Sequence, residues 1–359
     1  MKGKKSVVFI LPEYVEIPMG GYKVVYEYSN KLAEDGFDVT ILFPSFLYFS
    51  SSPLKRKLKL IFFFIYYSIF SRKGVKKWFP LNDKVKEKFV LTLEEKNIPE
   101  ADLYFATALE TADLLNRCKK VSQEKKYYLI QAVEDWRWGL DAFIQTLKYD
   151  MTKISVSPWL QTFLSSYGED SVLIENGVDR KMLKRETDPE KRDKFLVMML
   201  YHKQKLKAAK DGFMALNIVK EKYPELKSIW FGCPNKPSDL PDWIEYYQQP
   251  NEYELNVLYN KSAIYIGPSH SEGFGLTVGE AMSCGCAVAC TDTGGYLTMA
   301  KHKETALVSP IKDVPALAVN IIELIENDKL RYEIAEKGYD NIKQFTWEIA
   351  YKKLRKLIG

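Results

Sequence analysis

Two glutamates stand out in the segment HSEGFGLTVGE, residues 270–280, because they carry charge inside an otherwise apolar stretch. Between Gly273 and Thr291 the only charged side chain is that of Glu280, and Glu272 precedes it by eight residues. A buried carboxylate is costly unless hydrogen-bond donors meet it. A vicinal diol, such as that of a ribose, would supply two donors to Glu280. The alternative is that Glu280 caps a helix or pairs with a distant lysine.

The residues around these glutamates predict a strand, a loop and a helix in succession. The run AIYIGPS at 263–269 is typical of a buried strand, and LTVGEAMSCG at 276–285 is typical of a helix that ends at Gly285. Gly273 and Gly275 would let the loop turn tightly. The first turn of the helix would offer free N–H groups and the positive end of the helix dipole, which suits a phosphate.

Short apolar runs alternate with longer amphipathic stretches along the whole chain, which predicts parallel strands joined by helical crossovers. Amphipathic helices are expected at 22–36, 211–223 and 345–357. The predicted strands cover residues 6–12, 38–44, 102–108, 126–132, 153–158, 171–177, 195–201, 227–232, 263–268 and 287–292.

At 359 residues the chain is too long for most single cores, so we expect two domains. The predicted fold class is α/β, with two doubly wound Rossmann-like domains facing across a cleft. Residues 1–176 would form the N-terminal domain, and 177–340 the C-terminal domain. Residues 341–359 would pack back on the first domain. The polar stretch within 177–194 would join the two halves.

The composition is that of a globular protein, with 46% hydrophobic and 28% charged residues and a net charge of +5. No zinc-finger, RNP or helix-turn-helix pattern is present, so nucleic acid is not an expected partner. Cys284, Cys286 and Cys290 lack C-x2-C spacing, which favours buried thiols over a metal site. The N-terminal apolar run stops at Pro12, which favours a first strand over a signal peptide and predicts a cytoplasmic protein.

Residues 54–78 combine apolar and basic side chains. An uncharged run from Leu60 to Ser71 has four basic residues on each side, and no acidic residue occurs between Ser50 and Asn82. Twelve helical residues extend about 18 Å, which is too short to span a bilayer core of about 30 Å. Two interpretations remain: a buried helix with solvated lysines at its ends, or an interfacial helix on an anionic membrane.

The segment SHSEGFGLTVGEAMSCGCAVACTDTGG, residues 269–295, resembles the E-x7-E signature region of retaining GT-B glycosyltransferases of family 4. Weaker similarity extends to the Gly20-Gly21 loop, to SVSPWLQTFL at 155–164, to IENGVD at 174–179 and to FTWE at 345–348. The resemblance implies an enzyme that moves a hexose or deoxyhexose from a nucleotide-sugar to an acceptor, with retention at the anomeric carbon.

The resemblance also implies roles for particular residues. Glu280 would hold the ribose, and Glu272 would lie beside the transferred sugar. The Gly20 and Gly21 amides would approach the diphosphate from the first domain. The backbone that meets sugar and diphosphate would be that of Phe274, Gly275, Leu276 and Thr277.

A basic pair, commonly Arg and then Lys-Gly, neutralises the diphosphate in that family. Here the corresponding loop is YHKQKLKAAKDG, residues 201–212. Lys203 would take the Arg position and Lys207 the Lys position, so the predicted catalytic residues are Glu272, Lys203 and Lys207. Ala208 replaces the family's Gly. Two other assignments remain open: Lys205 and Lys210 could take these positions, or the lysines could form a solvated face.

Many members of the family carry a histidine of the first domain near the reacting sugar. All three histidines here, at 202, 270 and 302, belong to the second predicted domain. The segment QAVEDWRWG, residues 131–139, follows a strand at the corresponding place. Candidate contacts to donor or acceptor are Gln131, Glu134, Asp135, Trp136, Trp138, Thr107 and Glu110, each of which could instead serve only packing or solvation.

The sequence therefore predicts a nucleotide-sugar-dependent retaining glycosyltransferase of cell-surface polysaccharide or glycoconjugate assembly. Its acceptor would be a saccharide or a lipid-linked saccharide, and it would need no metal and no cofactor besides the nucleotide-sugar co-substrate. If residues 54–78 meet a membrane, the protein would be peripheral on the inner face. The alternatives are a catalytically silent GT-B subunit that binds a partner transferase, or another GT-B enzyme such as a nucleotide-sugar epimerase.

Overall fold

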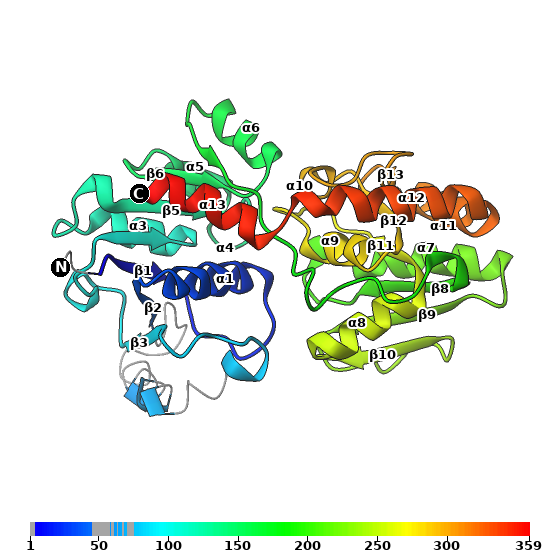
Figure 1. Ribbon diagram of the computed structural model, residues 1–359, viewed down its shortest axis with the longest axis horizontal. Coiled ribbons are helices and arrows are strands. Elements are labelled where there is room, and N and C mark those ends of the chain that lie inside the picture. The colour runs from blue at the N-terminus through cyan, green and yellow to red at the C-terminus, as the bar shows by residue number, and fades with distance from the viewer. Residues whose placement is uncertain (1–3, 45–57, 59–60, 63, 67, 70–74) are drawn as a thin grey trace. The chain divides into compact units, whose positions relative to one another are not determined.

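The computed structural model describes residues 4–44, 58, 61–62, 64–66, 68–69 and 75–359, except for the side chains of Trp136 and Arg137. The chain divides into two compact units, which we call unit 1, Met1–Ile174, and unit 2, Glu175–Gly359. Figure 1 shows one parallel sheet with flanking helices in each unit. This arrangement confirms the predicted α/β class with two doubly wound domains.

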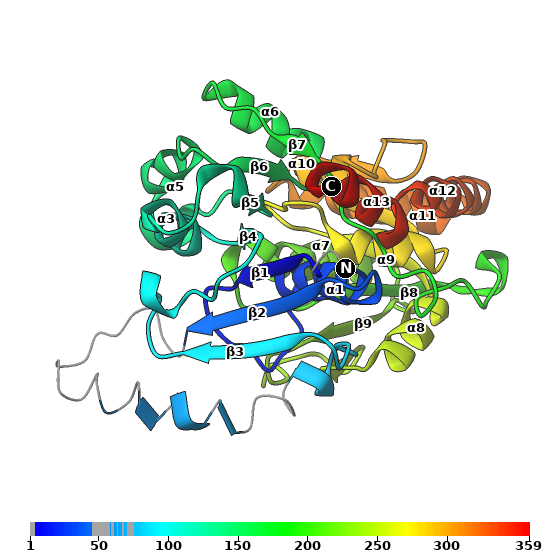
Figure 2. The same ribbon diagram turned by 60° about the vertical axis from the view of Figure 1, so that its left-hand side comes forward.

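Unit 1 contains a parallel sheet of seven strands in the order β3-β2-β1-β4-β5-β6-β7. Figure 2 shows β1, β2 and β3 side by side. Its strands are β1 Ser6–Ile10, β2 Asp38–Pro44, β3 Lys86–Val90, β4 Leu103–Ala106, β5 Lys126–Ile130, β6 Thr152–Ser155 and β7 Val172–Leu173. Its helices are α1 Gly20–Glu34, α3 Leu109–Arg117, α4 Asp135–Trp138, α5 Leu140–Leu147 and α6 Pro158–Ser166.

The order in which strands are added to the parallel sheet of unit 1 reverses between β1 and β4. After β1 the chain crosses to β2 on one side, whereas β4 pairs with the other side of β1. In open parallel sheets ligands bind at such a switch point, beyond the carboxyl ends of the strands. Gly20 follows β1 and Thr107 follows β4, so the topology brings two predicted site positions to this point.

Helix α1 forms as its sequence pattern predicts. It buries a face that includes Tyr22, Val25, Tyr26 and Ser29, whose spacing matches one side of a helix. The chain then turns at Gly36, whose φ of +89° lies in the left-handed region that favours glycine. The predicted end of this helix at Gly36 is thus confirmed.

Unit 2 contains a parallel sheet of six strands in the order β10-β9-β8-β11-β12-β13, so its switch point lies between β8 and β11. Its strands are β8 Asp193–Leu200, β9 Lys227–Gly232, β10 Ile244–Gln248, β11 Ser262–Gly267, β12 Ala287–Thr291 and β13 Leu307–Ser309. Its helices are α7 Ala209–Lys222, α8 Glu252–Lys261, α9 Leu276–Ser283, α10 Gly294–Leu297, α11 Val314–Glu326, α12 Asp328–Asn341 and α13 Trp347–Ile358.

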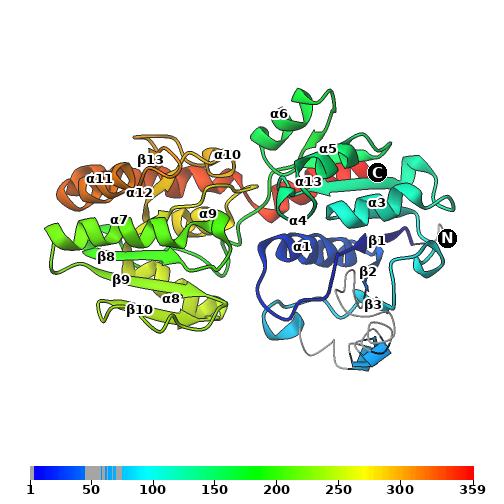
Figure 3. The ribbon, with the colours of Figure 1, turned by 180° about the vertical axis from the view of Figure 1, so that it is seen from behind.

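The core of unit 2 lies between this sheet and the helices α7, α11 and α12. Val197 and Met199 of β8 pack in one cluster with Leu216 of α7 and Ile321 of α11, all of them fully buried. Figure 3 shows α7 along β8 and β9. These apolar contacts fix the sheet from which the loops of the candidate site extend.

Three strands were not predicted, namely β3, β10 and β13. The sequence of β3, KEKFV, has three charged residues and a half-exposed pattern, because β3 lies at the edge of its sheet. β13 has only three residues. Every predicted strand corresponds to an observed one, although residues 171–177 contribute only the two residues of β7.

We predict that the cysteines behave as buried thiols. Cys118, Cys284, Cys286 and Cys290 are buried, and Cys233 is half-buried. Burial raises the pKa of every one of them, that of Cys286 to about 11, so thiolate is scarce at neutral pH. In the folded protein a disulfide reagent should label Cys233 alone at an appreciable rate, and all five thiols after unfolding. Rapid labelling of folded Cys233→Ser protein would contradict this.

Candidate functional site

Two loops meet at the switch point of unit 2. One follows β8 and covers residues 201–208, and the other follows β11 and covers 268–275. The backbone N–H of His270 donates to the Leu206 carbonyl at 2.7 Å. The His270 Nε2 and Asp211 Oδ2 atoms lie 2.6 Å apart, which ties the second loop to the first turn of α7. Because β8 and β11 are parallel neighbours, both loops leave the same edge of the sheet.

An ion pair joins the two loops. The Lys207 ammonium lies 2.8 and 2.9 Å from the two carboxylate oxygens of Glu272. The Glu272 side chain is only 9% exposed, and the hydroxyls of Ser269 and Tyr296 also donate to its Oε1, at 2.8 and 3.3 Å. Glu272 is therefore a buried carboxylate held by three donors, one of them a cation.

The contacts of the lysine loop distinguish its members. Lys207 is half-buried against Glu272, whereas Lys203, Lys205 and Lys210 are exposed. Ala208 has φ 48° and ψ 38°, a left-handed conformation at the position where the resembling family has glycine. This conformation costs an alanine about 1–2 kcal/mol. A glycine would adopt this conformation without that cost. The assignment of Lys207 to the Lys position stays a prediction.

The loop that enters α9 depends on a glycine. Gly275 has φ +93°, and a Cβ atom there would lie 2.4 Å from Cδ1 of Tyr296. Tyr296 is fully buried, and the same side chain reaches Glu272 through its hydroxyl. Within the described chain no side chain caps the N-terminus of α9, and its first turn holds no acidic residue. The first N–H groups of α9 are thus available to an anion near the Lys207–Glu272 pair.

Glu280 lies in the middle of α9 and is 7% exposed. The Tyr259 hydroxyl of α8 donates to its Oε2 at 3.3 Å. Burial, and then the charge of Glu280, hold the pKa of Tyr259 well above its ordinary value, so the hydroxyl keeps its proton and remains a donor. The predicted burial of Glu280 on this helix is confirmed, and its role as a ribose ligand stays a prediction.

In unit 1 the structure brings Gln131 to Gly21. The predicted Gly20-Gly21 loop is instead the first turn of α1, which begins at Gly20. The Gln131 Nε2 group donates to the Gly21 carbonyl at 3.1 Å, and a Cβ at Gly21 would lie 3.4 Å from that nitrogen. The Gln131 Oε1 atom is buried and has no hydrogen-bond partner among the described residues. Thr107, in contrast, is buried and donates to the Ile10 carbonyl at 2.7 Å, which joins the ends of β4 and β1.

Two of the candidate acidic residues, Glu134 and Glu110, accept hydrogen bonds within unit 1. Glu134 accepts a hydrogen bond from the Leu109 N–H at 3.1 Å and so caps α3. Glu110 accepts one from the Trp138 indole at 3.0 Å. Asp135 is exposed at the start of α4, and the Trp136 side chain lies outside the described residues.

Four residues that contact the site are not predicted from the sequence: Ser269, Tyr296, Tyr259 and Asp211. The Gly294-Gly295 pair was a sequence signal that the chain next to Tyr296 packs closely on another segment. That segment is the Glu272 loop, because a Cβ at Gly295 would lie 2.5 Å from the Glu272 carbonyl oxygen. Nothing in the sequence of α8 marks Tyr259. In the described ranges no three His, Cys, Asp or Glu side chains are arranged to hold a metal ion.

Comparison with known proteins adds to this geometry. Residues 183–341 match the model of the family described as Glycosyl transferases group 1, and this segment contains all the site residues of unit 2. The O-antigen chain mannosyltransferase B of Escherichia coli is 33% identical over 106 residues, which are 30% of this chain and 27% of that protein. The alignments span less than a third of the length of such curated relatives.

Two solved structures are similar over almost the whole chain. Sucrose-phosphate synthase from Thermosynechococcus elongatus has a TM-score of 0.73 at 16% identity, covering 99% of this chain and 98% of that chain. Anabaena HepE in complex with UDP-glucose has a TM-score of 0.72 at 13% identity, covering 98% of each chain. The fold is GT-B. No helix in the described part of this GT-B chain is long and apolar enough to cross a membrane.

We predict that Lys207 and Glu272 depend on each other energetically. Lys207→Met leaves a buried carboxylate without its cation and should lower the free energy of unfolding by about 2 kcal/mol. Adding Glu272→Gln should recover part of this loss, giving a coupling energy of about 1–2 kcal/mol in a double-mutant cycle measured by urea unfolding. Lys210→Met, at an exposed position, is the control and should change stability by less than about 0.5 kcal/mol. Additive effects would contradict the pairing.

We predict that His202, in the lysine loop, makes the stability of the folded protein depend on pH. Burial, and then the charge of Lys207, lower the pKa of His202, and its Nδ1 accepts the Gln204 N–H at 3.0 Å. The unfolded chain therefore binds this proton more readily than the folded chain. The resulting stability is full above the unfolded pKa of about 6.5 and is lost as the pH falls below it.

The test compares urea unfolding at about pH 7.5 and about pH 5.5. His202→Asn keeps an acceptor oxygen and should lose less stability on acidification than the unmodified protein. His302→Asn is a matched control, because His302 also accepts a backbone N–H at 3.0 Å but is exposed. Equal pH slopes for the His202 variant and the unmodified protein would contradict the prediction.

Proposed function

We propose that this protein is a retaining glycosyltransferase that moves a hexose or deoxyhexose from a nucleotide-sugar to an acceptor hydroxyl. The observation that carries the proposal is the Lys207–Glu272 pair beside the uncapped start of α9, with Glu280 buried further along the same helix. These groups offer a cation and free N–H groups for a diphosphate, and carboxylates for sugar hydroxyls.

In the proposed reaction the bond between the anomeric carbon and the diphosphate oxygen breaks, and its electron pair leaves with the diphosphate. The acceptor oxygen forms the new bond on the same face of the sugar, and its proton passes to a leaving-group oxygen. Lys207 has three N–H donors, of which two point at Glu272, so one remains for the diphosphate. Stabilisation of the leaving group by this donor and by the α9 amides would supply most of the catalysis.

The proposed division of roles follows the burial of each carboxylate. Glu280, with the Tyr259 hydroxyl on one oxygen, would accept hydrogen bonds from the ribose diol. Glu272 would meet the transferred sugar while it holds Lys207. In unit 1 the buried Oε1 of Gln131 would accept a hydrogen bond from a bound hydroxyl.

The proposed acceptor is a saccharide or lipid-linked saccharide of cell-surface polysaccharide or glycoconjugate assembly. The proposal is supported by the sequence similarity to the O-antigen chain mannosyltransferase of Escherichia coli, whose name refers to a cell-surface polysaccharide. Another support is that a protein with the same fold is known in complex with UDP-glucose. The proposal includes no metal and no cofactor other than the nucleotide-sugar.

A donor panel tests the proposal directly. UDP-, GDP- and dTDP-sugars are incubated with the protein, and release of free nucleoside diphosphate is measured with and without mixed oligosaccharide acceptors. Release from one donor class, abolished by Lys207→Met and retained in Lys210→Met, is the expected result. Absence of release from every donor, with nucleotide binding intact, would contradict catalysis and favour a silent binding subunit.

We predict that Glu280→Ala weakens nucleotide binding. Loss of hydrogen bonds to a charged, buried carboxylate should cost about 2 kcal/mol, or roughly 30-fold in Kd, measured by calorimetry with the nucleoside diphosphate of the active donor. Glu221→Ala, at an exposed position of α7, is the control and should bind normally. A 2′,3′-dideoxy nucleotide should lose affinity for the unmodified protein but not for Glu280→Ala. Unchanged affinity of Glu280→Ala would refute the ribose assignment.

A further inference from the structure

A row of apolar side chains in unit 1 is turned toward solvent. Leu58, Ile61, Phe62, Ile65 and Ile69 are helical and are 63%, 46%, 63%, 52% and 67% exposed. Their spacing of three, one, three and four residues places them on one face of a helix. We call these five residues the apolar stripe.

Exposure of this kind reverses the usual arrangement of an amphipathic helix. In α11, for comparison, Leu317, Ile321 and Leu324 have similar spacing and are at most 1% exposed. Single exposed apolar residues are common on protein surfaces, but a contiguous row of large ones marks an interaction site. The exposure of these five described residues does not fit the buried-helix interpretation, whereas the rest of the predicted segment from 54 to 74 lies mostly outside the described residues.

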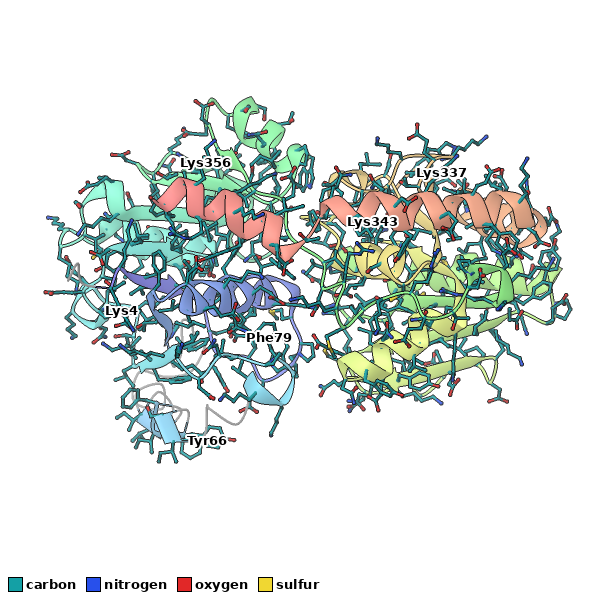
Figure 4. All side chains as sticks on the ribbon, viewed as in Figure 1. Lys4, Tyr66, Phe79, Lys337, Lys343 and Lys356 are labelled. Carbon is teal, nitrogen blue, oxygen red and sulfur yellow. The ribbon has the colours of Figure 1, made fainter. Side chains whose placement is uncertain are left out.

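The chain after the stripe is anchored to unit 1. Val75 and Phe79 are buried, and the Trp78 and Phe79 rings lie 5.5 and 5.4 Å from that of Tyr26 in α1. In Figure 4 Tyr66, which stacks with Phe62 at 6.3 Å, lies farther from α1 than Phe79 does. The stripe is thus presented on the outside of a unit whose core holds the neighbouring residues.

The charges in the surrounding sequence indicate what the stripe meets. Four basic residues, at 55, 56, 57 and 59, lie around its start, and four more, at 72, 73, 76 and 77, follow its end, with no acidic residue between Ser50 and Asn82. Apolar side chains flanked by lysine and arginine match the two layers of an anionic bilayer surface, namely acyl chains and negative headgroups. A protein partner would not require basic residues on both sides of the stripe.

We infer that the apolar stripe docks unit 1 on an anionic lipid bilayer, with Leu58, Phe62, Ile65 and Ile69 entering the interfacial layer. The stripe would lie in the bilayer surface and would not span the bilayer, because the uncharged run of twelve residues in this part of the sequence is too short to cross about 30 Å of hydrocarbon. The inference does not depend on transferase activity. It is tested without any sugar donor, so its failure is distinct from a failure of the proposed function.

The experiment is flotation of the full chain with vesicles of phosphatidylcholine alone or of phosphatidylcholine with phosphatidylglycerol. The protein should float with the anionic vesicles at low salt and bind them about tenfold or more less well at high salt. The double variant Phe62→Glu/Ile65→Glu should lose binding by about tenfold or more. Val319→Glu, which changes an equally exposed apolar residue of α11, should bind as the unmodified protein does.

Both variants change exposed positions, and thermal unfolding should confirm that they fold like the unmodified protein. Equal binding to neutral and anionic vesicles, no flotation with either, or normal flotation of the double variant would each overturn the inference. Sedimentation of the unmodified protein as a dimer that Phe62→Glu/Ile65→Glu dissociates, without flotation, would assign the stripe to a second copy instead.

Discussion

Burial of the Glu272 carboxylate is the interaction on which the rest of the site depends. A charge with so little solvent must be met by protein donors, and those donors come from three places along the chain: Lys207, Ser269 and Tyr296. Each contact fixes a neighbour in turn. Tyr296 can reach Glu272 only because Gly275 has no side chain, and Gly275 is the N-cap residue of α9. One buried charge therefore fixes the geometry at the start of α9.

A second buried charge supports the other end of that helix. The Arg192 guanidinium is 6% exposed and donates to the carbonyls of Tyr259 and Cys284, near the carboxyl ends of α8 and α9. A cation there neutralises free carbonyls and the negative ends of two helix dipoles. The same two helices carry Tyr259 and Glu280, so Arg192 holds the frame in which that hydrogen bond forms. Its neighbour Cys286 lies 3.7 Å away as a buried thiol, with no chemical role required.

Much of this architecture is predictable from the sequence because it rests on local patterns. β2 and β9 follow from apolar runs with bounds that match the observed strands, and Gly36 and Gly285 end their helices with φ of +89° and +79°. The pairs that complete the site are not local. Tyr259 and Glu280 meet only because α8 and α9 both pack on β11. The strand β3 is not predicted from hydrophobic periodicity, because an edge strand tolerates charged residues on its open side. Contacts between distant segments require the fold.

In the lysine loop, contacts with the distant Glu272 loop determine which lysine reaches the carboxylate. Four lysines lie between residues 203 and 210, and their types and spacing alone do not choose among them. The Asp211–His270 contact and the His270–Leu206 hydrogen bond hold this loop against the one that carries Glu272. The left-handed turn at Ala208 then directs the chain into α7. With both ends fixed, Lys207 is the lysine that reaches the carboxylate.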